Sequence, residues 1–521
     1  MQKEIIYPID SANFRWIREK KMIYVDKTEF IHKMINSNGK YYFLARPRRF
    51  GKSLFLDTLA EYFQGYREPF RGLAIDSLQP EEWEKYPIIR FNMSGKAYMK
   101  DDDLRNHIKG LLNELEEKYS YKSEETENEL RFSNLISKIS ANSSKKIVIL
   151  IDEYDAPLSS AIGNRELQEK YREELHGFYS VLKNREESIR FCMLTGVTRY
   201  GKVSVFSGLN NLNDITFDNE YAAICGITKE ELHRYYDEGV EILAEKLDTG
   251  KEEIYEKLRF HYDGYHFSSS MRDIYNPFSI NYAFAKKEFQ DYWCRSGVPT
   301  ILSKSLMEND YDVRELNGSL VEESTLADLS VYSTNPIPLF YQTGYLTLKG
   351  YDPEDGLFTV DYPNREVEKG MLNNILTVYN PGSKGVMPTV SRLKRSLKEG
   401  NPEEFIKILS SFLSSIPNQL HKYVDRYENY YHTVFYCLTK LIGLDVSVEY
   451  STSEGFIDML IKTADYVYII ELKLNGTAED AIRQIDEKHY AAPFAEDQRR
   501  LYKVGIGFSK TTHSISSSLI I

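Results

Sequence analysis

Cysteine is scarce in this chain of 521 residues, and the four cysteines lie far apart, with no CxxC pair among them. This spacing argues against a zinc ribbon and against a disulfide framework, and it fits a reducing cytoplasm. No apolar run exceeds the length of a strand, so we expect no transmembrane helix. The first residues, MQKEIIYPIDSANF, contain no apolar signal region, so we expect no secretory leader. These absences predict a cytoplasmic protein.

An excess of positive charge is also absent. The 66 Lys and Arg residues against 78 Asp and Glu residues give a formal net charge of −12. A field of this sign does not favour general attraction to nucleic acid, although it is compatible with a locally basic groove. What the chain does have is length enough for about three domains. It also has a globular composition, with 42% hydrophobic residues and 40 tyrosines.

The stretch YYFLARPRRFGKSLFLDTLAEYFQ, from Tyr41 to Gln64, has the layout of a P-loop. An apolar strand leads into a loop rich in Arg and Pro, and Gly51-Lys52-Ser53 then opens a helix with apolar residues at three- and four-residue spacing. Backbone N–H groups at such a helix start bind phosphate. In this motif Lys52 reaches the outer phosphates and the Ser53 hydroxyl holds magnesium.

Arg46 stands where the usual pattern, G-x-x-x-x-G-K-[ST], has its first glycine. Glycine at that position allows a tight turn at positive φ, so a loop with Arg46 must close differently. From this stretch alone, an ordinary basic loop in front of a helix is the alternative to a nucleotide site.

A second signal of a nucleotide site follows in KKIVILIDEYD, roughly 100 residues further on. The unbroken apolar run Ile147–Ile151 is typical of a central parallel strand that is buried on both faces. Asp152 then lies at the carboxyl edge of the sheet, where open α/β sheets bind ligands. We predict that Asp152 assists magnesium and that Glu153 orients or activates the attacking water.

A third apolar strand, Ile189–Leu194, ends in the sequence TGVTR. Its tip lies at the same ligand-binding edge of the predicted sheet. Thr195, at this tip, is the candidate sensor of the γ-phosphate. Arg199 is either a finger that contacts phosphate or a salt-bridge partner within its own loop.

Further elements are expected around these motifs. Strands are predicted at Met22–Val25 and Tyr221–Cys225, with a loop at Ser207–Thr216. The sequence TKEE from Thr228 predicts a helix start with a capping box. The pattern from 228 to 383 is mainly helical, except for a small hairpin at Leu339–Leu348 and Leu357–Asp361. The segment Asn380–Asn401, rich in Gly, Pro and Ser, predicts a linker.

Four stretches together resemble the bacterial AAA-like ATPase family of the P-loop superfamily: YVDKTEFI, LARPRRFGKSLFLDTLAEYF, IVILIDEYDAPL and LTGVTRYGKVSVFSGLNNL. The loop of that family itself reads R-P-R-R-F-G-K-S, so the resemblance makes Arg46 the family's form of the loop. It covers Ile5 to Ile280 and implies an ATPase core. In this modified loop Arg46, Arg48 and Arg49 are expected near enough to phosphate to contact it.

The last part of the chain carries charged residues inside apolar strands. Gly455–Ile461 and Tyr466–Leu474 are predicted as neighbouring strands, with Asp458 in the first and Glu471 and Lys473 in the second. Residues two apart on a strand share a face, and burying such charges is costly unless they are paired or bound to metal. Adjacent carboxylates attract a hard divalent cation, most simply magnesium. A salt-bridged surface hairpin is the alternative.

The layout of Asp458, Glu471 and Lys473 resembles the PD-(D/E)XK nuclease superfamily, in the variety fused behind AAA-like ATPases. The resemblance implies two further site residues. Glu428 matches the acidic residue of the first helix and is a candidate metal ligand, and Gln484 matches the polar residue of the helix after the motif. It also implies magnesium-dependent cleavage of a phosphodiester, in which Lys473 holds the attacking water or stabilises developing charge.

These patterns predict an α/β protein. Its parts are a P-loop NTPase parallel sheet with a helical lid region, plus a C-terminal restriction-endonuclease-like α/β domain. The expected boundaries are 1–227 for the ATPase domain, 228–383 for the lid region, 384–401 for the linker and 402–521 for the nuclease-like domain.

The leading functional hypothesis is ATP-coupled, magnesium-dependent cleavage of nucleic acid, with ATP and Mg²⁺ as cofactors. We expect nucleic acid as the partner, DNA ahead of RNA, and no membrane. The sequence is also compatible with a homo-oligomer. The alternative is a nucleotide-dependent switch or scaffold whose C-terminal domain binds nucleic acid or a partner without cutting. The net charge of −12 fits this alternative slightly better.

Overall fold

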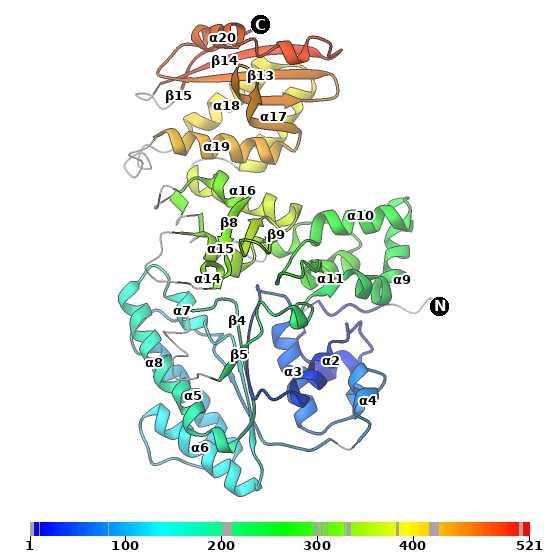
Figure 1. Cartoon of the computed structure of the whole chain (residues 1–521), viewed down its shortest axis with the longest axis vertical. Helices are drawn as coiled ribbons and strands as arrows, with labels where there is room; N and C mark the ends of the chain where they lie inside the picture. Colours follow the sequence, from blue (N-terminus) through cyan, green and yellow to red (C-terminus); the bar gives the residue numbers. More distant parts are fainter. Residues whose placement is uncertain are drawn as a thin grey trace. The chain divides into compact units, whose positions relative to one another are not determined.

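The computed structural model divides into two compact units (Figure 1). The first comprises Met1–Ser296 and Leu316–Val367, and the second comprises Gly297–Glu315 and Glu368–Ile521. The structure describes residues 5–9, 11–81, 83–200, 211–295, 302–303, 306–307, 309, 311–327, 329, 335–381, 385–415, 427–509 and 514–521, without the side chains of 427–432.

The first unit is built on a parallel sheet of five strands in the order β2-β3-β4-β1-β5. Every residue of β1 and β3 is buried, as unbroken apolar runs predict for interior parallel strands. Because β4 pairs with both β3 and β1, the carboxyl ends of these three strands meet at one edge. The strands are β1 (Tyr41–Ala45), β2 (Ile88–Asn92), β3 (Ile147–Asp152), β4 (Ile189–Gly196) and β5 (Leu212–Asp214).

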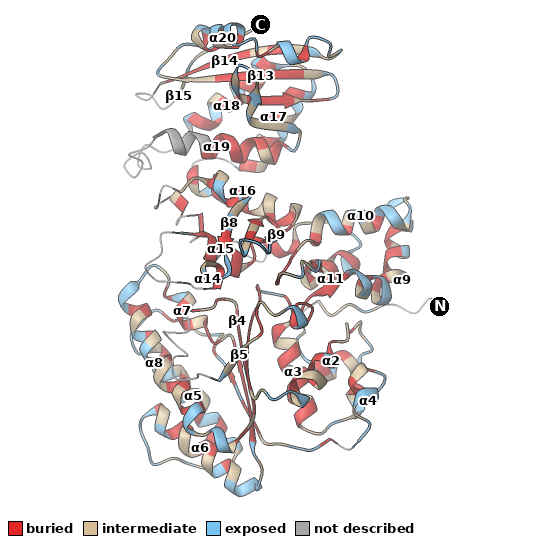
Figure 2. Cartoon of the chain, in the orientation of Figure 1, coloured by how far each residue is buried: buried red, intermediate tan, exposed pale blue. Residues whose placement is uncertain are grey.

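Helices cover both faces of this sheet (Figure 1). On one face, α5 (Asp103–Lys118), α6 (Asn128–Ser143) and α8 (Arg165–Asn184) share a core with alternate strand positions. On the other face lies α3 (Lys52–Phe63), whose Phe63 ring is centred 5.3 Å from that of Phe191. Buried residues concentrate in the sheet and in the helix faces turned toward it (Figure 2). The shorter helices are α1 (Phe14–Glu19), α2 (Thr28–Asn36), α4 (Ala74–Leu78) and α7 (Ala156–Ser160).

Three local predictions for this unit were wrong. Met22–Val25 belongs to no strand, although the N–H of Ile23 donates to the carbonyl of Ile6 at 2.9 Å. Tyr221–Cys225 is a series of turns after the short helix η3 (Asn219–Tyr221). Leu212–Asp214, within the expected loop, forms β5 and pairs with β1. The preceding part of that loop, 207–210, lies outside the described residues.

The lid region combines helices with a second sheet. Three helices share one core: α9 (Lys229–Leu247), α10 (Lys251–Tyr262) and α11 (Pro277–Lys286). The capping box is confirmed, since Thr228 Oγ1 accepts the N–H of Glu231 at 3.2 Å. An antiparallel sheet follows with β8 (Ser319–Glu322), β10 (Leu357–Asp361) and β9 (Thr347–Asp352), in that order. The predicted hairpin is therefore present as β9–β10, but Ile337–Thr343 is the helix α15. Small elements here are α12 (Tyr292–Arg295), α14 (Glu323–Ala327), β6 (Ile227–Thr228) and β7 (Ile274–Tyr275).

The second unit is a mixed sheet with strand order β11-β12-β13-β14-β15. Only the β13–β14 pair is parallel within the described residues, and α20 (Ala478–Glu487) connects these two strands. One face packs on α20, and the other faces α17 (Val386–Lys398), α18 (Pro402–Ser414) and α19 (Tyr427–Ile442) (Figure 1). The strands are β11 (Asp445–Thr452), β12 (Gly455–Lys462), β13 (Tyr466–Leu474), β14 (Arg500–Ser509) and β15 (Ser514–Ile520).

The segment expected as a linker is largely helical instead. It contains α17, whose Val390, Leu393 and Leu397 are buried at helical spacing. Tyr468 Oη of β13 donates to the carbonyl of Leu397 at 2.7 Å, which ties this helix to the second unit. The chain enters the second unit for Gly297–Glu315, returns to the first, and passes to the second for the last time within α16 (Arg365–Tyr379).

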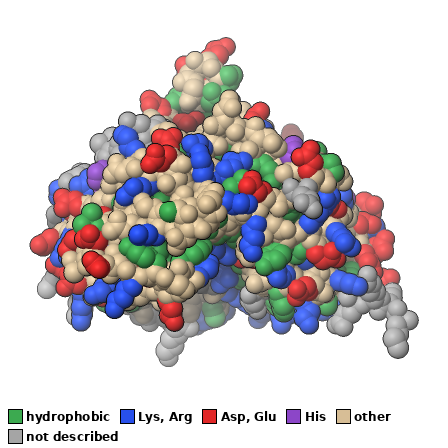
Figure 3. Space-filling model, turned by 90° about the horizontal axis from the view of Figure 1, so that it is seen from below, with side chains coloured by type: hydrophobic (Ala, Val, Ile, Leu, Met, Phe, Trp, Pro, Cys, Tyr) green, Lys and Arg blue, Asp and Glu red, His purple; other side chains and the backbone are tan. Residues whose placement is uncertain are grey.

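Two broad expectations from composition can be compared with the structure. All four cysteines are free and buried. Among the described residues, no helix is both long and apolar enough to cross a bilayer. On the face shown in Figure 3, basic side chains are interspersed with acidic and hydrophobic ones.

Candidate functional site

The loop after β1 ends in a left-handed residue at the start of α3. Gly51 has φ of 98° and caps α3, and its carbonyl accepts the N–H of Phe55 at 3.0 Å. Glycine adopts such a positive φ without strain. The first N–H groups of α3 have no partner within the helix, as at every helix start, and they are the donors that bind phosphate in a P-loop. The predicted order of strand, loop and helix is confirmed.

Lys52 is buried, and its ammonium is held inside this loop. Its Nζ donates to the carbonyls of Arg46 at 2.7 Å and Pro47 at 2.9 Å. Burial lowers the pKa of Lys52, and the nearby carboxylate of Asp152 acts in the opposite direction. A phosphate would exchange two neutral acceptors for an anionic one, and charged hydrogen-bond partners are the stronger ones.

Asp152 lies beside Thr195 at the ends of neighbouring strands. Thr195 Oγ1 donates to Asp152 Oδ1 at 2.7 Å, and both side chains are buried. Glu153 follows with φ of 50°. Burial raises the pKa of its carboxyl group, while Lys52 and Arg48 lower it. The structure thus gathers the predicted phosphate ligand, magnesium ligand, base and sensor in one place.

The oxygen donors near this loop suit magnesium, which prefers hard oxygen ligands. Ser53 lies half-buried in the first turn of α3, and Asp152 ends β3. Their roles as magnesium ligands stay predictions.

Asp155 fixes the turn that follows β4. Its carboxylate accepts the N–H of Thr198 at 2.7 Å, the N–H of Val197 at 3.2 Å and the hydroxyl of Thr198. A side chain at Gly196 would clash with it, because an added Cβ would lie 2.5 Å from Asp155 Oδ1. Asp155 therefore holds the strand end that carries Thr195. In the sequence its only signal is that it is the third acid of the DEYD run.

The guanidinium of Arg46 is buried among carbonyl groups. It donates to the carbonyls of Ala45 at 2.9 Å, Thr216 at 2.8 Å and Tyr221 at 3.3 Å. It also lies 4.3 Å from the centre of the Phe267 ring. This placement differs from the expectation that Arg46 contacts phosphate, since its donors link the P-loop to the segment after β5 instead.

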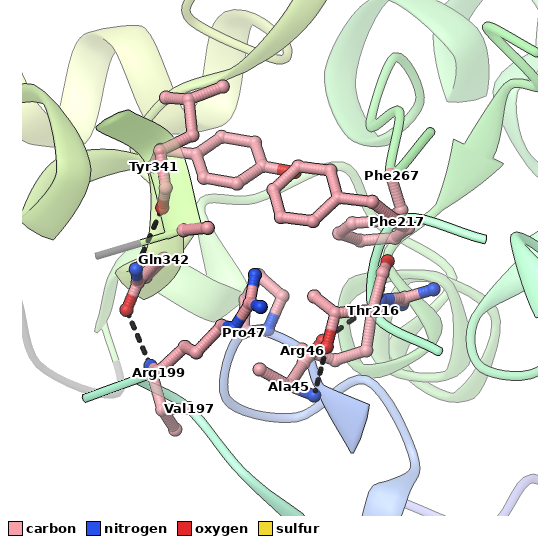
Figure 4. A pocket seen from close by; sticks show the side chains of 12 residues that line it. Ala45, Arg46, Pro47, Val197, Arg199, Thr216, Phe217, Phe267, Tyr341 and Gln342 are labelled. Atoms are coloured by element: carbon pink, nitrogen blue, oxygen red, sulfur yellow. Dashed lines mark hydrogen bonds between the residues drawn. The ribbon is translucent and has the colours of Figure 1, made fainter. Parts of the chain in front are cut away.

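Arg46 and Arg199 line a small cavity of about 20 Å³ (Figure 4). Such a volume holds roughly one water molecule. Arg199 forms an ion pair with Asp214 at 2.7 Å, and its N–H donates to Gln342 Oε1 at 2.7 Å. Arg199 therefore occupies the salt-bridge role that the sequence left open, and a contact with phosphate would require this pair to break.

The two remaining arginines of the loop, Arg48 and Arg49, are exposed. Arg49 has φ of 69°, and its guanidinium lies 4.9 Å from the centre of the Phe278 ring. Their contact with phosphate stays a prediction.

Residues from far along the chain cover the P-loop. The indole N–H of Trp293 donates to the carbonyl of Arg48 at 3.0 Å, across a sequence separation of 245 residues. Gly344 has φ of 89°, and a Cβ built there would lie 2.6 Å from the Cβ of Pro47. No local sequence pattern points to these contacts.

Glu366 holds Trp293 in this position. Its buried carboxylate accepts the backbone N–H of Trp293 at 2.5 Å and the hydroxyl of Ser279 at 2.7 Å. Burial raises the pKa of Glu366 to about 7.

We expect Glu366 to make the protein less stable as the pH rises from about 4.5 to about 7. In this window the unfolded chain has lost the proton that the folded protein keeps. The free energy of unfolding therefore falls with pH, by on the order of 3 kcal/mol across the window. The Glu366→Gln variant imitates the protonated acid and should lack this part of the slope. Thermal melts of both proteins from pH 5 to pH 8 compare the slopes, and parallel curves would contradict the assignment.

A second cavity, of about 80 Å³, lies beside the start of α3. Its lining is mostly apolar with a few polar groups, as in small-molecule binding pockets. Asn281 contributes a polar group, and its Oδ1 accepts the hydroxyl of Tyr236 at 2.9 Å. The motifs did not identify this pocket because its walls come from separate segments. They include Pro8, Ile23, Val25, Phe50, Leu54, Ile227 and Pro277.

In the second unit, β12 and β13 place Asp458 beside Glu471. The two strands pair from Met459 opposite Ile470 onward, so these carboxylates are next in register. At this point Asp458 Oδ2 accepts the N–H of Leu472 at 2.7 Å. The structure therefore brings the two predicted carboxylates together where the strand pairing ends.

Lys473 and Gln484 complete this cluster. Lys473 Nζ lies 3.3 Å from Glu471 Oε1 and donates to Gln484 Oε1. Gln484 Nε2 donates to the same Glu471 oxygen. The side chain of Glu471 is 1% exposed and that of Lys473 is 28% exposed, so the ammonium faces solvent more than the carboxylate does.

Burial, together with repulsion from Asp458, raises the pKa of Glu471 to about 7, and Lys473 opposes this shift. Two carboxylates supply the oxygen ligands that Mg²⁺ prefers. Among the residues with described side chains, no three His, Cys, Asp or Glu residues form a metal-binding group. Glu428, predicted as a further ligand, lies in α19, but its side chain is outside the described set.

Two family models match the chain. Residues 8–206 match a family of predicted AAA-ATPases, and residues 426–518 match a PD-(D/E)XK nuclease superfamily model. The uncharacterized protein in the vnfD 5′ region of Azotobacter chroococcum mcd 1 is 34% identical over 521 residues, covering 98% of this chain and 97% of that protein. The solved Aeropyrum pernix ORC2 protein, in ADPNP–ADP complexes, covers 72% of this chain and 97% of its own, with 11% identity and a TM-score of 0.24. That score is too low to support a comparison of folds.

Proposed function

Because the chain belongs to the family of predicted AAA-ATPases with a C-terminal PD-(D/E)XK nuclease superfamily domain, we propose that it is an ATP-coupled, Mg²⁺-dependent nuclease. ATP would bind in the first unit, and nucleic acid, DNA ahead of RNA, would be cleaved in the second. One observation carries the proposal. Where the pairing of β12 with β13 ends, four polar side chains cluster, namely those of Asp458, Glu471, Lys473 and Gln484. The same chain has the strand–loop–helix arrangement of a P-loop.

In the first unit, the start of α3 and Lys52 would bind the phosphates of ATP. Ser53 and Asp152 would hold Mg²⁺ there, and Glu153 would orient the attacking water. Thr195, which donates to Asp152, would respond to the γ-phosphate. The base would occupy the apolar cavity beside α3.

In the second unit, Asp458 and Glu471 would hold a divalent cation. When bound, Mg²⁺ polarises a phosphodiester and lowers the pKa of a coordinated water. Lys473 would hold the attacking water and stabilise the charge that develops on the phosphate. Gln484 donates to Glu471 and accepts from Lys473, so it fixes the distance between acid and base.

A second candidate function is a nucleotide-dependent switch that binds nucleic acid or a partner without cutting it. Within this candidate, the net charge of −12 favours a partner other than nucleic acid, because the general attraction of an acidic protein to a polyanion is weak. Both candidates assume a cytoplasmic protein, and both are compatible with a homo-oligomer.

Cleavage assays separate the two candidates. The purified full chain is incubated with single- and double-stranded DNA and with RNA, with and without Mg²⁺ and with and without ATP. Cleavage that needs Mg²⁺ and changes with ATP supports the nuclease. Intact nucleic acid under every condition supports the switch.

The Lys52→Ala variant should bind ATP at least about tenfold more weakly than the wild type, because it loses a charged hydrogen-bond donor to phosphate. Titration calorimetry with Mg²⁺ and ATP measures the affinity. Lys138→Ala, at an exposed lysine of α6, is the matched control and should bind normally. Equal ATP affinities of the two variants would show that Lys52 does not bind ATP.

A further inference from the structure

The amino edge of the five-stranded sheet, opposite the edge that carries the P-loop, is lined with basic side chains. Lys40 directly precedes β1, Lys146 directly precedes β3, and Lys85 lies shortly before β2. The strands pair in the order β2-β3-β4-β1, so the segments that lead into them lie side by side along this edge. Figure 3 looks onto this end of the first unit, where basic side chains gather around a central furrow.

Two helices end at the same edge and add to its charge. Lys118 is the last residue of α5, and its Nζ lies 3.5 Å from the carbonyl oxygen of Ile88, the first residue of β2. Lys183 lies in the last turn of α8, where the carbonyl of Leu182 accepts the hydroxyl of Tyr41, the first residue of β1, at 3.1 Å. Lysines at helix ends also stabilise the helix dipole, whereas those in front of the strands have no such role.

Positive charge at this edge exceeds what its acids neutralise. In the segments that precede the strands, Glu84 pairs with Lys145 at 3.1 Å and Glu186 pairs with Lys40 at 3.9 Å, while Glu187 is exposed. A row of uncompensated cations on a protein with a net charge of −12 is the electrostatic footprint of an anionic partner. Four lysines of the edge are exposed and form no ion pair within the part of the chain that the structure describes: Lys85, Lys118, Lys146 and Lys183.

The segment in front of β2 is held in place by its neighbours. The ring centre of Tyr86 lies 5.6 Å from Lys145 Nζ and 6.0 Å from Arg190 Cζ. Tyr86 Oη donates to Glu84 at 2.5 Å, and Lys145 Nζ donates to the carbonyl of Lys85 at 3.0 Å. These contacts tie the segment to β3 and β4, so the backbone positions from which the lysines project are fixed.

We propose that this amino edge binds the sugar–phosphate backbone of nucleic acid. The inference rests on the proposed function and deepens it, because it gives the ATPase unit a substrate-binding surface of its own. Neighbouring strands lie about 4.8 Å apart, so a row across four strands is about 14 Å long and meets several phosphates. Lysines bind phosphate as point charges and do not read bases, so the binding is independent of sequence. The P-loop lies at the other edge of the sheet, so ATP and nucleic acid do not compete.

Binding of a short fluorescein-labelled DNA duplex to the full chain tests the proposal, with EDTA present so that no metal links the carboxylates of the second unit to phosphate. The double variant Lys85→Ala/Lys146→Ala should bind roughly tenfold more weakly than wild type at about 50 mM salt. The slope of log affinity against log salt should fall by about 2, one for each lost phosphate contact, so the difference should nearly vanish at about 200 mM. Lys85→Arg/Lys146→Arg keeps both charges and should bind as wild type does.

Lys229→Ala/Lys286→Ala is the matched control. Both lysines are exposed, form no ion pair within the described part of the chain, and lie in α9 and α11 of the same unit. This variant should keep the affinity and the salt slope of wild type, because its lost charges lie away from the amino edge. Equal losses of affinity in the two alanine variants would reflect net charge alone and would overturn the proposal.

A parallel reaction with Mg²⁺ reports on the proposed function itself. Cleavage by wild type, with unchanged duplex binding by Lys85→Ala/Lys146→Ala, overturns the inference alone. Binding that depends on these lysines, without cleavage, overturns the nuclease alone, and absence of binding and cleavage by wild type overturns both. Vesicles of phosphatidylserine and phosphatidylcholine test another anionic surface. Lysine-dependent binding of the vesicles without binding of the duplex overturns the assignment to nucleic acid.

Discussion

The Lys473→Ala variant is expected to lose metal-dependent cleavage while it binds ATP as well as wild type does. Lys473 is the cation of the cluster, 3.3 Å from Glu471 and hydrogen-bonded to Gln484. Removing one group that stabilises developing charge costs roughly a hundredfold to a thousandfold in rate. The proposed ATP site lies in the other compact unit and shares no residue with this cluster.

Two controls make this prediction specific. Lys407→Ala removes a lysine of α18 that is 81% exposed in the same unit, and it should cleave normally. Gln484→Ala keeps the cation but removes its positioning partner, so it should reduce cleavage less than Lys473→Ala does. Wild-type cleavage rates in Lys473→Ala would show that this lysine takes no part in the reaction.

Replacing Arg46 by the glycine of the usual P-loop pattern is expected to lower the free energy of unfolding. Arg46 is not among the described residues with positive φ, so the loop closes without the conformation that favours glycine. Arg46→Gly would remove the guanidinium donor of the Ala45 and Thr216 carbonyls and open a cavity beneath the Phe267 ring. The Tyr221 carbonyl would keep the N–H of Ile224 at 3.1 Å. A buried carbonyl left without a partner costs about 1–3 kcal/mol of unfolding free energy. Urea denaturation of the full chain, followed by tryptophan fluorescence, measures the change.

Arg49→Gly is the matched control for this experiment. Arg49 is exposed and has φ of 69°, a conformation that glycine adopts more readily than arginine. Its replacement should leave stability within about 1 kcal/mol of wild type. If Arg46→Gly were as stable as Arg49→Gly, the buried guanidinium would not be the link between the P-loop and the segment after β5.

Much of the fold could be predicted because its signals are local. The run IVILID carries its own burial pattern, and the α3 periodicity identifies the helix that starts at Lys52. The sequence could predict that Asp458, Glu471 and Lys473 lie close together, because residues two apart on a strand point to the same face. The predicted order of domains rested on such local motifs and on family resemblance.

The errors have physical causes. Met22–Val25 has the apolar residues of a strand, but Ile23 and Val25 line the cavity beside α3 rather than joining a sheet. β5 is three residues long, and its pairing with β1 decides its conformation more than its own sequence does. Gly, Pro and Ser around α17 suggested a linker, but the segment is a helix whose apolar face is buried within the second unit.

The rest of the candidate site depends on contacts between distant residues. Asp155 accepts hydrogen bonds from the N–H groups of Val197 and Thr198, which lie 42 and 43 residues away in the sequence. Glu366 accepts the backbone N–H of Trp293, which lies 73 residues away in the sequence. Such pairs leave no periodic pattern in either segment, so only the folded chain reveals them.

The cover over the P-loop has a consequence for how the protein is made. Pro47 and Arg48 are synthesised early, but Gly344 and Trp293, which pack on them, leave the ribosome hundreds of residues later. Glu366, which holds Trp293, comes last. A nascent chain, or a truncated one that stops at residue 227, therefore has the strands of the ATPase sheet but an uncovered phosphate loop. Attempts to express that sheet alone should extend to residue 367, where the first unit ends.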